Sequence, residues 1–495
     1  MALLEEPIKQ PRLVKNYVDG DWVEAKGEVR DIVNPATGQV IGRVPISTKE
    51  EFGAAVAAAK EAFWDWRSTP PPARARYLFR FKELLEENFE ELSRIQTQEH
   101  GKTIDESRGE TRRGIENVEV ACGIPTLQMG DYLEDIASGI DEYIIRQPLG
   151  VFGIIGPFNF PFMIPLWSAP YAVATGNCVV IKPSSEVPLS QLRIAELAEE
   201  AGFPPGVWNV VNGGREVVSS MLEHPDIAGV TFVGSTPTAK YIYEQCGKTG
   251  KRVIAQAGAK NFMVIMPDCN VDRTVPALMT SFFGNAGQRC LAGANLLIVG
   301  EDDSFYNSFV EKVVGMAKGI VMGYGLDEAV QMGPVRDEEK KQRILRYVDI
   351  GLKEGAKLAL DGRQMKIHGD YPRSCFVGPT VFTGVTPEMT IAREEIFGPV
   401  MSVLRAKNLD EAIQMCNDNP FGNGHAVFTS NGNVAREFRY RVVSGNVGIN
   451  VGIVAPMAFF PFSGMKDSFF GVLHTQGKEA VRFFTESKVV IERWL

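Results

Sequence analysis

The amino-acid sequence predicts an α/β protein with two domains, each built on a largely parallel sheet. Short, β-branched apolar runs alternate with helical segments up to residue 255, and the same alternation returns after Lys260. The chain has 495 residues, whereas a single hydrophobic core rarely grows beyond about 250–300 residues. Two domains are therefore expected.

The N-terminal quarter is predicted to be mainly helical. Apolar residues recur at helical spacing over residues 49–66, behind a Ser47-Thr48 cap. A long, charged amphipathic helix is predicted over residues 73–100, and a third helix over residues 106–122.

The strands of the two sheets follow. The first set is predicted at residues 151–156, 178–182, 207–211, 229–233 and 252–255, with helices at 189–201 and 217–223. The second set is predicted at 262–266, 295–299, 400–404 and 425–429, with helices at 271–283, 303–318, 340–355, 409–417 and 433–442. Ligands of such sheets bind beyond the C-terminal strand ends. Further strands are predicted at 142–146 and 489–494, the last reaching towards a partner.

Composition excludes several classes of function. The formal net charge of −9 argues against nucleic acid as a partner, because no basic excess is available to neutralise phosphates. No apolar run approaches the roughly 20 residues of a membrane span, and the acidic N-terminus lacks a leader pattern, so a cytoplasmic protein without membrane contacts is expected. Seven cysteines without a C-x-x-C pair and five dispersed histidines favour neither disulfides nor a metal site.

Cys290 is the candidate nucleophile. It ends a Gly-rich stretch, Gly284-Asn-Ala-Gly-Gln-Arg-Cys290, that follows an apolar helix. The adjacent Arg289 predicts an electropositive setting that favours the thiolate. The competing interpretation is a buried core cysteine.

Asn159 is the candidate oxyanion donor. It lies in Gly156-Pro-Phe-Asn-Phe-Pro161, a rigid turn directly after a strand, where a fixed amide can stabilise negative charge. An ordinary turn asparagine is the alternative.

Other strand ends carry residues that suit a phosphorylated cofactor. Lys182 begins Lys-Pro-Ser-Ser-Glu186, Gly213-Gly214 follows another strand, and a small-residue turn at 233–236 opens a helix whose N–H groups can bind phosphate. A carboxylate within 394–399 could hold a ribose hydroxyl. No G-x-G-x-x-G fingerprint is present, and a solvated strand-end lysine is the alternative for Lys182.

Taken together, six short motifs occur in the order typical of one superfamily. They are Pro157-Phe-Asn-Phe-Pro161, Lys182-Pro-Ser184, Phe232-Val-Gly-Ser235, Gly258-Ala-Lys-Asn261, Gly287-Gln-Arg-Cys290 and Glu395-Ile-Phe-Gly-Pro399. The chain resembles the aldehyde dehydrogenase superfamily from about Val18 to its C-terminus. Residues 113–119, 257–261 and 455–464 resemble the methylmalonate-semialdehyde dehydrogenases, which acylate coenzyme A.

The resemblance implies an aldehyde dehydrogenase fold with three parts. A Rossmann-type NAD(P)-binding domain would comprise residues 1–122 and 147–257, and an α/β catalytic domain residues 258–450. A β-arm, residues 123–146 and 475–495, would build a homodimer or homotetramer.

The same resemblance implies roles for individual residues. Cys290 would be the nucleophile, and the Asn159 amide with the Cys290 N–H would form the oxyanion hole. Arg113 and Arg289 would hold a substrate carboxylate, although Arg113 could instead pair with a glutamate of its own helix, Glu116 or Glu119. The implied cofactor contacts are Gly156, Phe158, Lys182, Ser185, Glu186, Ser235, Glu395 and Phe397, and no metal is implied.

Gln256 bears on the acyl acceptor. It stands where the family carries the glutamate base of Glu-Leu-Gly-Gly-Lys, and an amide cannot accept a proton at neutral pH. The resemblance therefore implies oxidation of methylmalonate or malonate semialdehyde through a Cys290 thioester, with NAD and coenzyme A. Ser185 stands where relatives carry a glutamate, which leaves NADP open.

Two alternatives belong to other classes of function. The first is a hydrolytic aldehyde dehydrogenase that releases free acid, with Glu395 as its base. The second is a structural or binding protein without catalysis, which the presence of both Cys290 and Asn159 disfavours.

Overall fold

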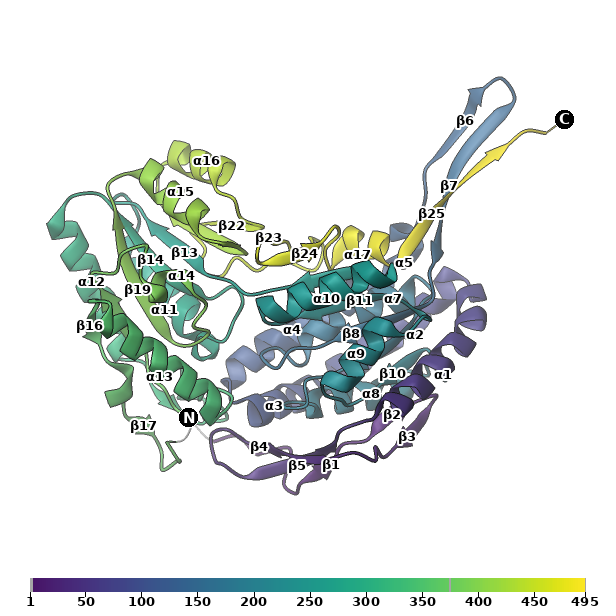
Figure 1. The fold of residues 1–495 in the computed structure, drawn as a ribbon, viewed down its shortest axis with the longest axis horizontal. Helices are drawn as coiled ribbons and strands as arrows, with labels where there is room; N and C mark the ends of the chain where they lie inside the picture. The colour runs from purple at the N-terminus through teal and green to yellow at the C-terminus, as the bar shows by residue number, and fades with distance from the viewer. Residues whose placement is uncertain (1–2, 374, 495) are drawn as a thin grey trace.

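The computed structural model describes residues 3–373 and 375–494. The ribbon forms two large lobes and a narrow arm that extends from one of them (Figure 1). Each lobe contains one large sheet with helices packed on it, and the arm is a small sheet of its own. The α/β class expected from the sequence is confirmed.

The first lobe is built on an eight-stranded sheet in the order β24-β12-β11-β8-β9-β10-β2-β3. Its five central strands are parallel, and they match the predicted set. Strands β24, β2 and β3 complete the edges in antiparallel register. The bounds are β2 (Asn16–Val18), β3 (Asp21–Val23), β8 (Val151–Ile155), β9 (Cys178–Lys182), β10 (Trp208–Val210), β11 (Ile227–Val233), β12 (Arg252–Gln256) and β24 (Phe469–Gly471).

Helices cover this sheet. The prediction of one helix over residues 73–100 is wrong. This segment forms two helices that meet at Asn88, whose φ and ψ are −102° and 16°. Thr48 and Thr103 each begin a helix with a reciprocal capping box. The helices are α1 (Lys49–Ser68), α2 (Pro71–Glu87), α3 (Phe89–His100), α4 (Ile104–Cys122), α5 (Ile124–Leu127), α6 (Met163–Leu166), α7 (Ala169–Ala174), α8 (Leu189–Glu200), α9 (Arg215–Glu223), α10 (Thr236–Thr249) and α17 (Gly477–Phe483).

The second lobe contains a seven-stranded sheet in the order β16-β18-β19-β14-β13-β21-β22, parallel except for β16. Its strands are β13 (Asn261–Ile265), β14 (Gly293–Val299), β16 (Lys357–Leu360), β18 (Thr380–Thr383), β19 (Val400–Ala406), β21 (Gly424–Phe428) and β22 (Asn446–Ile449). Its helices are α11 (Val271–Phe283), α12 (Asp303–Lys318), α13 (Glu338–Lys353), α14 (Thr390–Arg393), α15 (Leu409–Asp418) and α16 (Gly432–Arg441). The predicted elements of this half are confirmed to within a few residues.

Three small sheets complete the fold. Their strands are β1 (Arg12–Leu13), β4 (Val29–Val33) and β5 (Val40–Pro45); β15 (Met322–Gly323) and β17 (Ile367–His368); and β20 (Phe421–Gly422) and β23 (Met465–Lys466). No helix within residues 3–373 and 375–494 is both long and apolar enough to cross a membrane.

The arm is an antiparallel sheet of β6 (Tyr132–Ala137), β7 (Ile140–Pro148) and β25 (Thr485–Glu492). The C-terminal segment of the arm begins later than in the range 475–495 expected from the sequence. Helix α17 packs into the core of the first lobe through Ala480, Val481 and Phe483, so the extension begins at Thr485.

The chain crosses between the lobes after β22, in residues 450–471, which we call the crossing segment. Residues of this crossing segment pair with both lobes, since β23 pairs with β20 and β24 pairs with β12. The range 258–450 expected for the catalytic domain omits this segment, which lines part of the candidate active site described below. The division into a cofactor lobe and a catalytic lobe stays a proposal.

Candidate active site

Cys290 lies in a tight turn between α11 and β14. Asn285 and Ala286 adopt left-handed backbone angles, with φ of 53° and 49°, and Gly287 has φ of 71°. A Cβ at Gly287 would lie 2.2 Å from the carbonyl oxygen of Gly398, so only glycine fits there. This strained turn fixes where the thiol points.

Two side-chain amides hold the Cys290 backbone in place. Asn261 and Asn423 donate to the Cys290 carbonyl oxygen at 2.8 and 2.9 Å. Both residues come from the second lobe, so the nucleophile candidate is anchored on the lobe opposite the predicted cofactor sheet.

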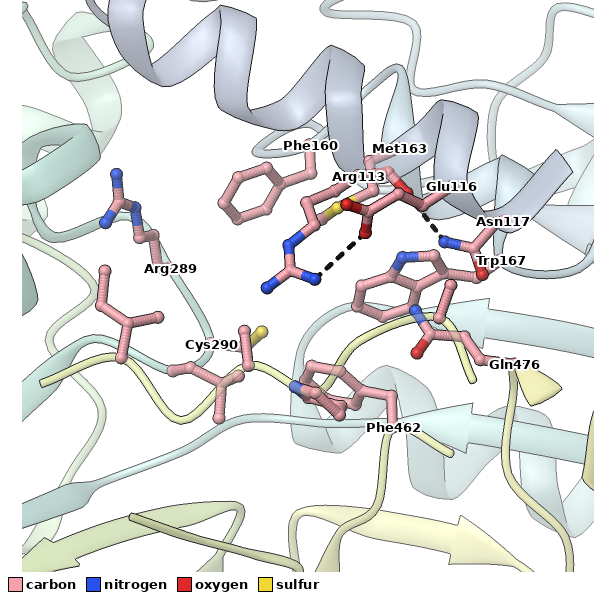
Figure 2. Close-up of a pocket in the computed structure, with 15 residues that line it drawn as sticks. Arg113, Glu116, Asn117, Phe160, Met163, Trp167, Arg289, Cys290, Phe462 and Gln476 are labelled. Carbon is pink, nitrogen blue, oxygen red and sulfur yellow. Dashed lines mark hydrogen bonds and ion pairs between the residues drawn. The ribbon is translucent and has the colours of Figure 1, made fainter. Parts of the chain in front are cut away.

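Two cavities meet at Cys290. The narrow cavity, about 70 Å³, is closed by aromatic and aliphatic side chains from α4, the 160–167 turn and the crossing segment (Figure 2). The wide cavity, about 420 Å³, lies at the C-terminal ends of the parallel strands β8, β9, β10, β11 and β12. A thiol at this junction can contact ligands from both sides.

Arg113 reaches into the narrow cavity from α4. Figure 2 shows its guanidinium inside the cavity, bound to Glu116 of the same helix at 3.1 Å. The alternative helix pair is thus present, and the expected contact with a substrate carboxylate stays a prediction. Arg113 is 34% exposed and Glu116 is 21% exposed, so the pair is accessible to a small ligand.

Arg289 behaves differently from the expectation. Its guanidinium points away from Arg113 (Figure 2) and forms an ion pair of 2.9 Å with Glu106. Glu106 also accepts the backbone N–H of Asn285, at 2.5 Å. Arg289 therefore braces the turn that carries Cys290.

The predicted thiolate-favouring environment of Cys290 is wrong. Burial of the thiol raises its pKa to about 12, and the carboxylate of Glu395 raises it further. The backbone N–H groups of Cys290 and Leu291 oppose this by donating to the sulfur. Arg289 pairs with Glu106 and is not among the groups that lower the pKa of the thiol.

Asn159 lies beside the nucleophile, as expected. It is 5% exposed and lines the wide cavity together with Cys290. Its amide nitrogen donates one bond, of 3.0 Å, to the carbonyl oxygen of Gln288, and an amide nitrogen has two hydrogens to donate. The second hydrogen and the Cys290 N–H can serve an oxyanion.

Seven of the eight expected cofactor contacts line the wide cavity. Glu186 is the exception, because its carboxylate pairs with Lys340 of α13 at 2.8 Å. The residues that line the cavity as expected are Gly156, Phe158, Lys182, Ser185, Ser235, Glu395 and Phe397.

The backbone of the wide cavity has no room for side chains at two turns. A Cβ at Gly213 would lie 2.4 Å from Val217, and a Cβ at Gly234 would lie 2.4 Å from the ring of Phe232. Burial lowers the pKa of Lys182 to about 8, and its Nζ donates to the Gly213 carbonyl at 3.3 Å. Sequence reasoning missed the further lining residues Arg215, Thr238 and Arg343, which no local motif marks.

Glu395 and Phe397 belong to one loop that lines the wide cavity. Glu395 accepts the N–H of Ala259 at 2.8 Å, and burial raises the pKa of its carboxyl. Phe397 has φ of 60°, and its ring meets Phe158 edge-on with centroids 5.9 Å apart. The turn therefore places a carboxylate and an aromatic edge beside Cys290.

Gln256 does not reach the nucleophile in the described structure. Its side chain is 2% exposed, and its Nε2 donates to the carbonyl oxygen of Phe462 at 2.8 Å. Phe462 lines the narrow cavity, so Gln256 supports the wall of that cavity from behind.

Residues 3–373 and 375–494 contain no group of three or more His, Cys, Asp or Glu side chains placed to hold a metal ion. The chemistry that the described groups can perform is nucleophilic attack by a thiol beside two fixed hydrogen-bond donors.

Comparison with known proteins agrees with this geometry. The model of the aldehyde dehydrogenase family matches residues 22–490. Malonate-semialdehyde dehydrogenase 2 of Geobacillus kaustophilus is 48% identical over 97% of this chain and 99% of its own length.

Two solved structures share the fold over nearly the whole chain. Methylmalonate-semialdehyde dehydrogenase from Oceanimonas doudoroffii superposes with a TM-score of 0.95 at 41% identity, covering 98% of this chain and 99% of that one. An aldehyde dehydrogenase from Bacillus cereus in complex with NAD⁺ gives a TM-score of 0.92 at 33% identity, covering 98% and 97%. The chain thus belongs to the aldehyde dehydrogenase family.

Proposed function

We propose that this protein oxidises malonate or methylmalonate semialdehyde through a thioester on Cys290, with NAD as hydride acceptor and coenzyme A as acyl acceptor. One observation carries the proposal: Cys290 lies where a narrow cavity containing Arg113 meets a wide cavity at the strand ends. The names of the Geobacillus and Oceanimonas relatives support the choice of substrate.

The chain's own groups account for the first bond. The sulfur of Cys290 attacks the aldehyde carbon, and the carbonyl oxygen becomes an oxyanion. The free hydrogen of the Asn159 amide and the Cys290 N–H then donate to it. Such donors act strongly in a cavity from which water is excluded, because they are already oriented before the reaction.

The wide cavity suits a dinucleotide. A side chain would not fit at Gly213 or Gly234, so a phosphate can approach the backbone there, and the hydroxyl of Ser235 stands at the start of α10. Lys182 and Glu395 are placed to bind ribose hydroxyls, and Phe158 and Phe397 offer ring edges. Bound NAD supplies the hydride acceptor for the tetrahedral adduct on Cys290.

NAD is preferred to NADP in this proposal because the B. cereus relative was solved with NAD⁺. Ser185 adds no negative charge to the wide cavity, and Arg215 adds a positive one, so NADP stays the second candidate. Initial rates with the two cofactors decide between them.

The acyl group is proposed to leave Cys290 for the thiol of coenzyme A. Two carboxylates line the cavities with Cys290, and both are engaged: Glu116 binds Arg113, and Glu395 binds the Ala259 N–H. Gln256 supports a wall and offers no base. The cations Lys182, Arg215 and Arg343 bring positive charge to the wide cavity, which suits phosphorylated ligands.

Arg113 is proposed to bind the carboxylate of the substrate. The ligand would take the place of Glu116 beside a guanidinium that already lies in the cavity. Arg289 could contribute only by releasing Glu106, so we assign the carboxylate to Arg113.

Hydrolysis to free acid is the second candidate. The raised pKa of Glu395, in a cavity shared with Cys290, is the observation that favours it. Product analysis with and without coenzyme A separates the two: acyl-CoA formation supports the first proposal, and free acid at an equal rate without coenzyme A supports hydrolysis.

We also propose a homodimer or homotetramer joined through the arm. Apolar side chains are exposed on it at Tyr132, Leu133, Val489 and Ile491, and such surfaces are usually covered by a partner. Light scattering of the full chain tests the assembly.

The cytoplasmic location stays a prediction from the sequence.

A further inference from the structure

Lys260 is a buried lysine with an unsatisfied amine. Its side chain is 1% exposed, and its Nζ has no hydrogen-bond partner among the described residues. Burial of a polar group without hydrogen bonds is unfavourable, so such a group calls for an explanation.

The neighbours of Lys260 in the chain touch the proposed active site on both sides. Ala259 donates its N–H to Glu395, and Asn261 donates its side-chain amide to the carbonyl oxygen of Cys290, each at 2.8 Å. Lys260 therefore lies on the segment that joins the carboxylate to the nucleophile.

Lys260, Cys290 and Glu395 also line one small cavity of about 20 Å³. A polar cavity larger than about 10–15 Å³ can hold one water molecule. The cavity therefore has room for one water molecule that could carry a proton between the groups that line it.

The thiol of Cys290 needs a proton acceptor. Its pKa of about 12 keeps it protonated at neutral pH, and a thiol is a far weaker nucleophile than a thiolate. Arg289 is paired with Glu106, and among the described residues no histidine lines the narrow, the wide or the small cavity.

We propose that Lys260 is the group that accepts the proton of Cys290. The S–H bond breaks, the proton forms a new N–H bond on Nζ, and thiol plus amine become thiolate plus ammonium. No electron transfer and no other reactant is involved. The ammonium can return its proton when the acyl group leaves and Cys290 is again a thiolate.

The charges around Nζ support this role. Burial lowers the pKa of Lys260 to about 7, while Glu395 and Glu394 act to raise it. A substantial share of the amine is thus neutral near neutral pH, where a general base is most effective. Arg343 of α13 donates to the Glu395 carbonyl and acts to lower the pKa of that carboxyl, against the larger effect of burial, which raises it. Once the proton has moved, the thiolate and the ammonium attract each other, which favours the transfer.

The inference rests on the proposed role of Cys290, and its test needs no substrate or cofactor. The full chain is treated with iodoacetamide from about pH 5 to about pH 10, and the rate of Cys290 labelling is read by mass spectrometry. In the wild type, we expect the labelling rate to rise with pH, with a midpoint near the pKa of the Lys260 amine. In Lys260→Met and Lys260→Gln, the rate at neutral pH should fall by at least about tenfold, and the midpoint should move up.

Lys466→Met is the matched control. Lys466 is a half-buried lysine of the same lobe, but its Nζ is satisfied by main-chain carbonyls, including that of Asn419 at 2.6 Å. This variant should keep the wild-type labelling profile.

Three results would overturn the proposal. They are unchanged labelling in the Lys260 variants, an equal shift in Lys466→Met, or a wild-type profile that rises only at strongly alkaline pH. The last readout needs no variant, so a folding defect leaves the test intact. If turnover still depends on Cys290 in any of these cases, Lys260 alone loses its role and the proposed function stands.

Discussion

The ammonium group of Lys102 donates a hydrogen bond of 2.7 Å to the main-chain carbonyl of Asn159. The same ammonium pairs with Glu110, and both side chains are fully buried. Glu110 also accepts the N–H groups of Phe162 and Met163, at 2.9 and 3.1 Å. This ion pair ties α4 to the turn that carries the proposed oxyanion donor.

Removing either charge of that pair should destabilise the fold. Lys102→Met or Glu110→Gln leaves one partner buried and uncompensated, which typically lowers the free energy of unfolding by about 3–5 kcal/mol. Replacing both by apolar residues should be milder than either single change. Urea unfolding measures this, with Lys82→Ala at the more exposed Lys82–Glu86 pair as control, where less than about 1 kcal/mol is expected. Similar losses at both sites would contradict the role given to the buried pair.

Arg113→Ala should act selectively on acidic aldehydes. A charge-assisted bond contributes on the order of 1.5–3 kcal/mol, so kcat/KM for malonate semialdehyde should fall by about 10–100-fold. The loss for propanal, which has no carboxylate, should be much smaller. Arg112→Ala is the matched control, because Arg112 belongs to the same helix but pairs with Glu86 at the surface. Equal losses on the two aldehydes would mean that Arg113 supports the fold and binds no carboxylate.

Gln256→Glu should not create a hydrolase. A carboxylate cannot donate to the Phe462 carbonyl and would be buried there, so we expect a loss of about 1–3 kcal/mol in stability and a higher KM. Gln414→Glu, at an exposed position of α15, is the control, expected within about 0.5 kcal/mol of the wild type. Chromatographic detection of free acid as the main product of the Gln256 variant would refute this placement.

Acid should destabilise the second lobe through His425. The Nδ1 of His425 accepts the N–H of Phe262 at 3.0 Å, and burial lowers the pKa of the imidazole to about 3. Because the folded-state pKa lies below the unfolded value of about 6.5, this group's contribution is present above that pH and is lost as the pH falls. The slope should approach about 1.4 kcal/mol per pH unit below about pH 6.

His425→Gln should reduce that slope, since glutamine does not titrate. The exposed His368 provides the comparison, and His368→Gln should leave the slope unchanged. Denaturant unfolding at several pH values gives the answer, and an unaltered slope in His425→Gln would assign the acid sensitivity to other groups.

The sequence was sufficient where the signal is local. Strands β8, β9 and β11 are largely apolar runs, and residues at and after their C-terminal ends line the wide cavity as expected. Cys290 and Asn159 lie in turns whose glycines and prolines are visible in the sequence. Local patterns therefore located most of the site.

The direction of long charged side chains was not predictable. Glu186 turns to Lys340 and Arg289 turns to Glu106, and these partners lie 154 and 183 residues away. Lys260 was missed for a related reason, because a lysine is exposed by default and only the fold shows that its amine is buried.

The proposed reaction passes through a thioester on Cys290, whose acyl group is transferred to coenzyme A. The full chain is mixed with NAD and malonate semialdehyde in the absence of coenzyme A, quenched, digested and analysed by mass spectrometry. We expect a burst of NADH close to one per site and an acyl group on the peptide that carries Cys290. Addition of coenzyme A before the quench should remove that acyl group as acyl-CoA. Steady NADH formation and free acid without coenzyme A would contradict the role of coenzyme A as acyl acceptor. An acyl group on any other residue would contradict the thioester on Cys290.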